Sequence, residues 1–71
     1  MRYLVVIEKS SNGFGAYAPD LPGCIAVAES EAEVRRLIQE AVEFHIEGLR
    51  EHGEAVPSPS STSALVEVAT E

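Results

Sequence analysis

Acidic side chains, 12 of the 71 residues, are the most numerous groups in this sequence that could do chemistry. Glu8, Glu40 and Glu67 come from three different segments and would meet only if the fold brought these segments together. Converging carboxylates can hold Mg²⁺, which supports nuclease chemistry. Glu40, however, lies on the polar face of a predicted helix, where exposure to solvent explains it more simply. We therefore predict no metal site and no cofactor.

The remaining reactive side chains fit structural roles. Cys24 begins a predicted strand far from any basic residue in the sequence, which is typical of a buried free thiol. His45 lies within an apolar helical stripe, which favours a core or interface position, and His52 ends that helix, where the dipole favours a cation. We expect no catalytic residue and hence no enzyme.

Three segments rich in β-branched, aromatic or small apolar residues are predicted to form a sheet that positions these groups. They are residues 2–9, about 14–18 and 24–28. Asn12 and Gly13 between the first two segments predict a tight hairpin with positive φ at both positions. The first strand has apolar residues on both faces, which indicates a central strand covered on both sides.

The sequence PDLPG joins the second and third strands. Pro22 fixes φ and Gly23 accepts a positive φ, as a type II turn requires. Asp20 can bond nearby backbone N–H groups as in an Asx turn, which leaves Leu21 to point inward or toward a partner. A rigid corner between strands is the structural alternative to a binding role.

A helix is predicted from about residue 31 to His52-Gly53. Ser30 and Glu33 form a capping-box pattern, and Gly53 suits the C-terminal cap. One stripe is apolar, whereas the opposite face is charged and includes Glu40, Glu43 and Glu47. Phe44 and Ile46 lie at the two edges of the stripe and widen the apolar arc beyond what one sheet needs. We therefore expect these two residues, with His45 at the centre of the stripe, to contact a second copy.

A polar segment with two prolines, VPSPSST, follows the helix, and residues 63–69, SALVEVA, resume a strand pattern. The order is β-β-β-α-β, which predicts one α/β (α+β) two-layer domain over residues 1–71. Its first three strands form an antiparallel meander, and the crossover rule places the fourth strand parallel to the first.

Charge and length limit the function classes. Five Lys and Arg against 12 Asp and Glu give a net charge of -7, which excludes a basic nucleic-acid binder. No apolar run approaches the roughly 18 to 20 residues of a membrane span, so we expect a complete cytoplasmic protein. Domains near 60 residues bury only about 60% of their unfolded surface, and the lack of any covalent staple favours a homodimer or higher oligomer.

The PDLPGC block, the helix after it, and the spacing of Gly53, Pro57 and Pro59 resemble the HicB antitoxin family of bacterial toxin-antitoxin pairs. The resemblance spans essentially the whole chain. It implies a partly degraded RNase H-like fold and a module that binds and inhibits a HicA-type mRNA endonuclease by occlusion. Full antitoxins of the family continue into a C-terminal DNA-binding domain, which is missing here, so we expect no direct nucleic-acid binding by this chain.

The expected toxin-binding surface includes the PDLPG turn and the acidic helix face, namely Asp20, Leu21, Glu40, Glu43 and Glu47. An acidic surface would speed the encounter with a cationic, RNA-binding toxin. The alternative is a stand-alone homo-oligomeric module with a regulatory or small-ligand-binding role and no toxin partner. A basic, toxin-sized reading frame beside the gene would separate the two.

Overall fold

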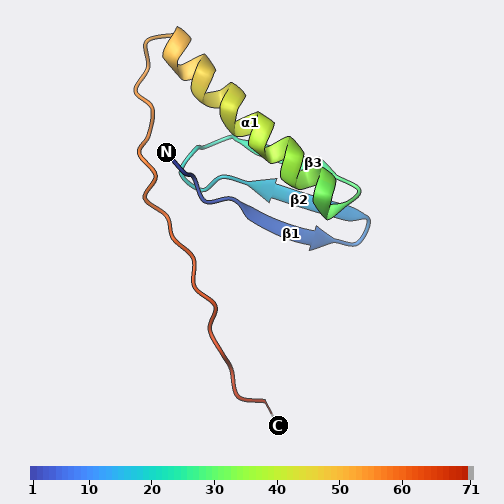
Figure 1. Cartoon of the computed structure of the whole chain (residues 1–71). Helices are drawn as coiled ribbons and strands as arrows, with labels where there is room; N and C mark the ends of the chain where they lie inside the picture. The colour runs from blue at the N-terminus through green and yellow to red at the C-terminus, as the bar shows by residue number, and fades with distance from the viewer. Residues whose placement is uncertain (71) are drawn as a thin grey trace.

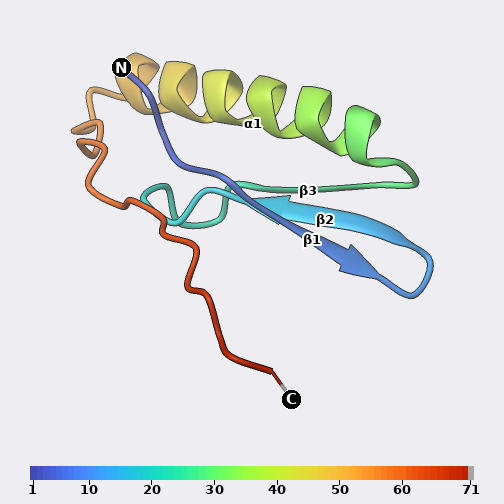
Figure 2. The same cartoon turned by 60° about the horizontal axis from the view of Figure 1, so that its bottom comes forward.

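The computed structural model, which describes residues 1–70, has three strands followed by one helix. The elements are β1 (Val6–Ser10), β2 (Gly13–Tyr17), β3 (Ile25–Ala28) and α1 (Glu31–Glu51). The strands form an antiparallel sheet in the order β1-β2-β3, and α1 lies across one of its faces (Figures 1 and 2). The predicted two-layer α+β arrangement with an antiparallel meander is confirmed.

The strand register decides which side chains face the helix. Ile7, Ala16 and Ala26 are neighbours across the sheet, and all three belong to the core or pack against it. Because side chains alternate along a strand, the next register row points to the opposite face. That open face carries exposed apolar residues, including Ile25 and Val27.

The core is small and entirely apolar. Its fully or nearly buried members are Ala16, Ala18, Leu21, Cys24, Val34 and Ile38. Val34 and Ile38 come from the predicted apolar stripe of the helix, which explains why α1 docks by this face. No charged or polar side chain is buried among residues 1–70.

Both predicted ends of the helix are confirmed. The Ser30 hydroxyl oxygen accepts a hydrogen bond of 3.2 Å from the backbone N–H of Glu33. At the other end Gly53 has a φ of +69°, and the N–H of Glu54 donates to the carbonyl oxygen of Leu49 at 2.8 Å. These contacts satisfy backbone groups that the helix itself leaves unpaired.

The hairpin between β1 and β2 differs from the prediction. Ser10 pairs with Gly13, and no residue other than glycine has a positive φ in the described chain, so Asn12 does not adopt one. Gly13 has a different reason to be glycine: a Cβ there would lie 2.6 Å from the carbonyl oxygen of Ala28. The close approach of two backbones therefore fixes this position.

The predictions of a central first strand and of a parallel fourth strand are wrong. Pairing joins β1 to β2 alone, so β2 is central, and residues 54–70 form no strand. The C-terminal tail, residues 54–70, passes the end of the sheet and leaves on the side away from α1 without pairing with β1 (Figure 2). The physical reason is a contact described below, which holds residues 60 and 61 at the turn after β2. The implied RNase H-like relationship stays a prediction.

Candidate partner-binding surfaces

The PDLPG turn is built around an inward-pointing leucine. The N–H of Cys24 donates to the carbonyl oxygen of Leu21 at 3.1 Å, and Gly23 has a φ of +84°, which confirms the predicted type II turn. The N–H of Leu21 also donates to the carbonyl oxygen of Ala18 at 3.0 Å. The Leu21 side chain is fully buried in the core. It takes the inward of the two predicted orientations, which corrects its assignment as a partner contact.

Asp20 holds the C-terminal tail. Its carboxylate accepts backbone N–H bonds from Ser60 at 2.8 Å and from Ser61 at 2.9 Å, and both serine hydroxyls donate to it as well, at 3.1 and 2.7 Å. We call these three residues the tail clamp. The prediction that Asp20 bonds nearby N–H groups is wrong, because its partners lie 40 and 41 residues away.

The tail clamp changes the acidity of Asp20. The backbone N–H groups of Ser60 and Ser61 lower the pKa of Asp20 from 3.8 to about 2, because they stabilise the ionised carboxylate. The Tyr3 hydroxyl ties the same segment once more by donating to the carbonyl oxygen of Pro57. Two contacts, at Tyr3 and at Asp20, therefore hold residues 57–61 against the folded domain.

The predicted acidic helix face is exposed to solvent. Glu40, Glu43 and Glu47 all lie outside the core. Glu40 is paired with Arg36 at 3.1 Å, and both side chains are more than half exposed. Such a pair is worth only about 0.3 to 0.5 kcal/mol, so it leaves the carboxylate open to other partners.

The three predicted oligomer contacts do not share one environment. Phe44 is 78% exposed, on the same outer side of α1 as Glu40 and Glu47. His45 is half-buried and lines a shallow hollow on the β3 side of the helix together with Phe44. Ile46 is half-buried on the β1 side and packs against the core. Successive residues of a helix point about 100° apart, so three consecutive side chains of α1 face different surroundings.

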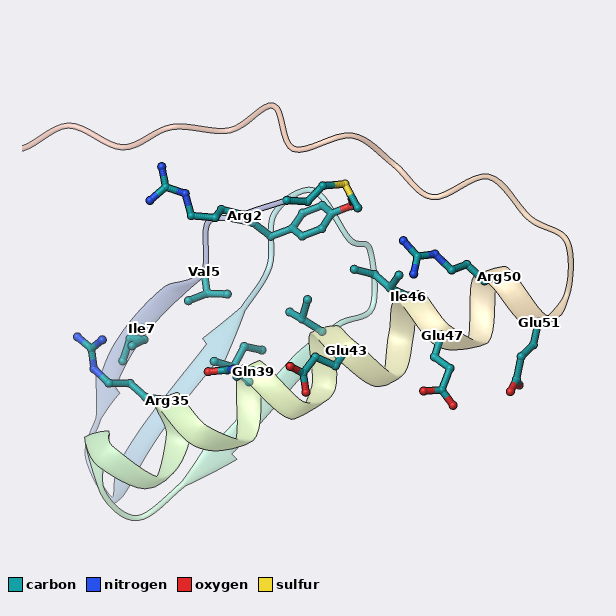
Figure 3. A pocket seen from close by; sticks show the side chains of 14 residues that line it. Arg2, Val5, Ile7, Arg35, Gln39, Glu43, Ile46, Glu47, Arg50 and Glu51 are labelled. Atoms are coloured by element: carbon teal, nitrogen blue, oxygen red, sulfur yellow. Dashed lines mark hydrogen bonds between the residues drawn. The ribbon is translucent and has the colours of Figure 1, made fainter.

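The structure has an open groove beside β1 that the sequence did not predict. It runs between residues 1–7, which include the start of β1, and α1, and it has a volume of about 990 Å³ (Figure 3). We call it the β1 groove. Its apolar floor is formed by Tyr3, Val5, Ile7, Ile38, Val42 and Ile46, and charged residues from the N-terminus and the helix form its rim. Glu43 and Glu47 lie on this rim. The groove exists because α1 packs chiefly against β2 and β3.

Two features of the sequence are consistent with the β1 groove. Val5 and Ile7 alternate on the helix-facing side of the first strand, and Ile46 widens the apolar arc of the helix. Both observations indicate more apolar surface on this side than one sheet and one helix can bury. The missing information was which strand would lie at the edge.

The structure does not bring the three candidate carboxylates together. Glu8 lies on β1, Glu40 on the outer face of α1 and Glu67 in the tail. Within residues 1–70 no group of three His, Cys, Asp or Glu side chains is close enough to hold a metal ion. Cys24 is buried, and desolvation raises the pKa of its thiol, which disfavours the reactive thiolate.

Comparison with known proteins identifies relatives over nearly the whole chain. Residues 3–70 match the family model described as HicB-like antitoxin of a bacterial toxin-antitoxin system. A UPF0150 protein of Thermoplasma acidophilum is 33% identical over 93% of this chain and 97% of its own length. An uncharacterised 14.9 kDa protein of Haemophilus phage HP1 is 39% identical over 80% of this chain, which spans only 43% of that protein.

Solved structures agree with the sequence relatives. A chain in the HicA3 and HicB3 toxin-antitoxin complex matches with a TM-score of 0.72 and 35% identity, over 84% of this chain and 70% of that one. A crystal structure of the antitoxin HicB3 matches with a TM-score of 0.68 and 35% identity, over 84% of this chain and 44% of that one. Among residues 1–70, no helix combines the length and the apolar character that crossing a membrane requires. The chain belongs to the HicB-like antitoxin family of bacterial toxin-antitoxin systems.

Proposed function

We propose that this protein neutralises a HicA-type mRNA endonuclease by binding it directly and covering its RNA-binding surface. The proposed place of action is the bacterial cytoplasm, where the mRNA is translated. The observation that carries the proposal is the outer face of α1, on which an exposed phenylalanine lies among carboxylates: Glu40, Glu43, Phe44 and Glu47. We call this set the acidic face.

The charge of the acidic face suits a cationic partner. The whole chain carries a net charge of -7, and three carboxylates lie close together on one side of α1. A protein that binds RNA must present positive charge to phosphate groups. An acidic antitoxin surface would therefore attract the toxin over several ångströms and compete with RNA for the same positive region.

Phe44 supplies an apolar contact that the carboxylates cannot make. The Phe44 side chain is 78% exposed. Its contact with water is unfavourable, and a partner that covers the ring would remove this apolar surface from water. Binding hot spots are commonly aromatic residues surrounded by a polar rim that excludes water. We assign Phe44 as the anchor and the carboxylates of the acidic face as the steering groups. Asp20 contributes indirectly, by fixing the tail, whereas Leu21 belongs to the core.

An RNA-cleavage assay tests this function. A HicA-type toxin encoded beside the gene for this protein is incubated with mRNA and increasing amounts of the chain. Cleavage should stop near the stoichiometric ratio of the two proteins. Replacing the three glutamates of the acidic face by glutamine should slow association on the order of tenfold at low salt, with a smaller effect on dissociation.

The matched control replaces three carboxylates away from the acidic face. Glu29, Glu31 and Glu54 lie before, at the start of and after α1 and are exposed, so E29Q/E31Q/E54Q removes the same charge without touching the proposed surface. This control should inhibit cleavage almost as well as the natural chain. Undiminished cleavage with the natural chain in excess would contradict the proposal and favour the stand-alone homo-oligomeric module.

A further inference from the structure

The hollow on the β3 side of α1 contains a glycine that the fold itself does not require. Gly48 is half-buried near the end of the helix and does not have a positive φ. Apart from the backbone of its own helix, a Cβ at this position would meet no atom within 4 Å. The role of the helix cap belongs to Gly53, which has the positive φ. Because glycine lowers the stability of a helix relative to alanine, Gly48 is unfavourable for the isolated chain.

The missing side chain of Gly48 leaves a gap beside Phe44. Phe44, Gly48 and His52 are spaced four residues apart, so they form one row along the helix. The hollow at this row has a volume of about 370 Å³, and its apolar lining includes Ile25, Phe44 and Leu49. We call it the β3 hollow. Its volume is at the lower end of the range of about 300 to 1,000 Å³ that ligand pockets span, so it suits a side chain of a partner better than a whole strand or helix.

The fold leaves the β3 hollow open to a partner. The last turns of α1 project beyond the strands, and the hollow lies there, next to the start of β3 (Figures 1 and 2). Two of its walls face water, since Ile25 is 67% exposed and Phe44 is 78% exposed. The His52 ring donates from Nδ1 to the carbonyl oxygen of Gly48 at 2.8 Å. This bond uses the backbone of Gly48, so a side chain at position 48 would not remove it.

Charge distinguishes between a toxin and a second copy as the occupant. Phe44 belongs both to the β3 hollow and to the acidic face, so a molecule in the hollow also lies beside the carboxylates of that face. A second copy docked there would bring two such faces together on chains that each carry a net charge of -7. Like charges in an interface oppose binding, whereas a cationic partner would be attracted. The observations therefore favour the toxin.

We infer that the toxin places an apolar side chain in the β3 hollow, against the backbone of Gly48 and the ring of Phe44. The inference rests on the proposed function and names the recognition site within it. Gly48 is then a specificity-determining position, because any side chain there would fill space that the toxin needs. The glycine that the isolated fold does not require is explained by the close approach of a partner.

Substitutions of Gly48 test this inference, because the fold leaves room for a side chain at this position. G48L fills the β3 hollow from within, and G48A adds one methyl group. Both variants should keep the helical circular dichroism and unfold at a higher urea concentration than the natural chain, because the glycine is replaced. In calorimetric titration with purified HicA-type toxin, G48L should bind on the order of tenfold more weakly or worse, and G48A should fall between G48L and the natural chain.

The matched control is A32L, which adds a leucine at an exposed position in the first turn of α1, away from the hollow and the acidic face. It should bind the toxin as the natural chain does. Equal affinities of G48L and the natural chain, with binding still weakened in F44A, would overturn this inference and leave the proposed function intact. No binding by the natural chain would contradict the proposed function and this inference with it.

A second measurement identifies the molecule in the β3 hollow. ¹³C-labelled chain is mixed with unlabelled toxin and studied by isotope-filtered NMR. The inference predicts intermolecular NOEs from the toxin to the methyl groups of Ile25 and Leu49. If these NOEs come instead from unlabelled copies of the chain in a mixture without toxin, and the toxin does not replace them, the hollow is a contact between copies and the inference is wrong.

Discussion

At the scale of single residues, Asp20 joins two parts of the chain that lie 40 residues apart. All four hydrogen bonds of the tail clamp end on its two carboxylate oxygens. An asparagine at this position could still accept from both backbone N–H groups through its oxygen, and its N–H₂ group could donate to the serine hydroxyls, which also accept. An alanine would remove every acceptor of the tail clamp.

We predict that D20A releases the tail while the sheet and helix stay folded. Backbone amide exchange at Ser60 and Ser61 should become faster, because all four bonds lose their acceptor. S58A is the matched control, since the Ser58 hydroxyl makes none of these bonds. Unchanged protection of both amides in D20A would show that the clamp does not hold the tail.

The acidity of Asp20 gives a second prediction. Its pKa is about 2 in the folded chain and 3.8 in its ordinary state, so the released carboxylate binds protons more tightly. The contribution of the clamp should be complete above about pH 3.8, decline as pH falls toward about 2, and vanish below that. The amide chemical shifts of Ser60 and Ser61 should titrate with a midpoint near 2. A midpoint near 3.8 would contradict the clamp.

Leu21 is predicted to matter for stability, not for partner contact. The side chain is fully buried beside Val34, so L21A removes core packing and leaves a cavity. The free energy of unfolding should fall by about 2 to 5 kcal/mol, measured by urea denaturation. A change below about 0.5 kcal/mol would mean that the turn does not pack as described.

At the scale of elements, α1 separates its tasks by face. One face supplies Val34 and Ile38 to the core, one edge forms a wall of the β1 groove, and the outer side carries Phe44.

The helix is held at its start by Ser30. S30A should lower the free energy of unfolding by about 1 kcal/mol, whereas S30D should retain the cap and much of the stability. Equal losses in both variants would contradict this role of the side chain.

The elements that the sequence predicted correctly depend on local chemistry. The type II turn at Pro22-Gly23, the cap at Ser30 and the end at Gly53 each follow from residues within a few positions of one another. The apolar stripe of the helix was equally readable, because its period is a property of one segment. The carboxylates of the acidic face could be predicted for the same reason, whereas the sequence pattern assigned Phe44 to an oligomer contact.

The errors concern contacts between distant segments. The position of the tail depends on the bond between Asp20 and residues 60 and 61, and no local pattern indicates that pairing. Without it, residues 63–69 read as a strand of the same sheet, and β1 reads as central. An apolar alternation shows which residues could form a strand, but it does not specify which sheet edge, if any, they will join.

At the scale of the whole molecule, a thin domain presents two adjoining surfaces around a small core. Its dimensions are 54 × 26 × 16 Å including the tail, so almost every side chain lies near a surface. The acidic face is assigned to the toxin. Two of its carboxylates, Glu43 and Glu47, also lie on the rim of the β1 groove, and the small core keeps both surfaces in place.

The most direct test of the central claim is calorimetric titration of a purified HicA-type toxin with the natural chain and with F44A. We predict saturable binding of one toxin per chain. Loss of the Phe44 ring should weaken it about 30-fold or more, as expected for a hot-spot residue worth about 2 kcal/mol. Because Phe44 is exposed, the stability of F44A should stay within about 0.5 kcal/mol of the natural chain. No binding by the natural chain, or equal affinities of the two chains, would contradict the assignment of the acidic face.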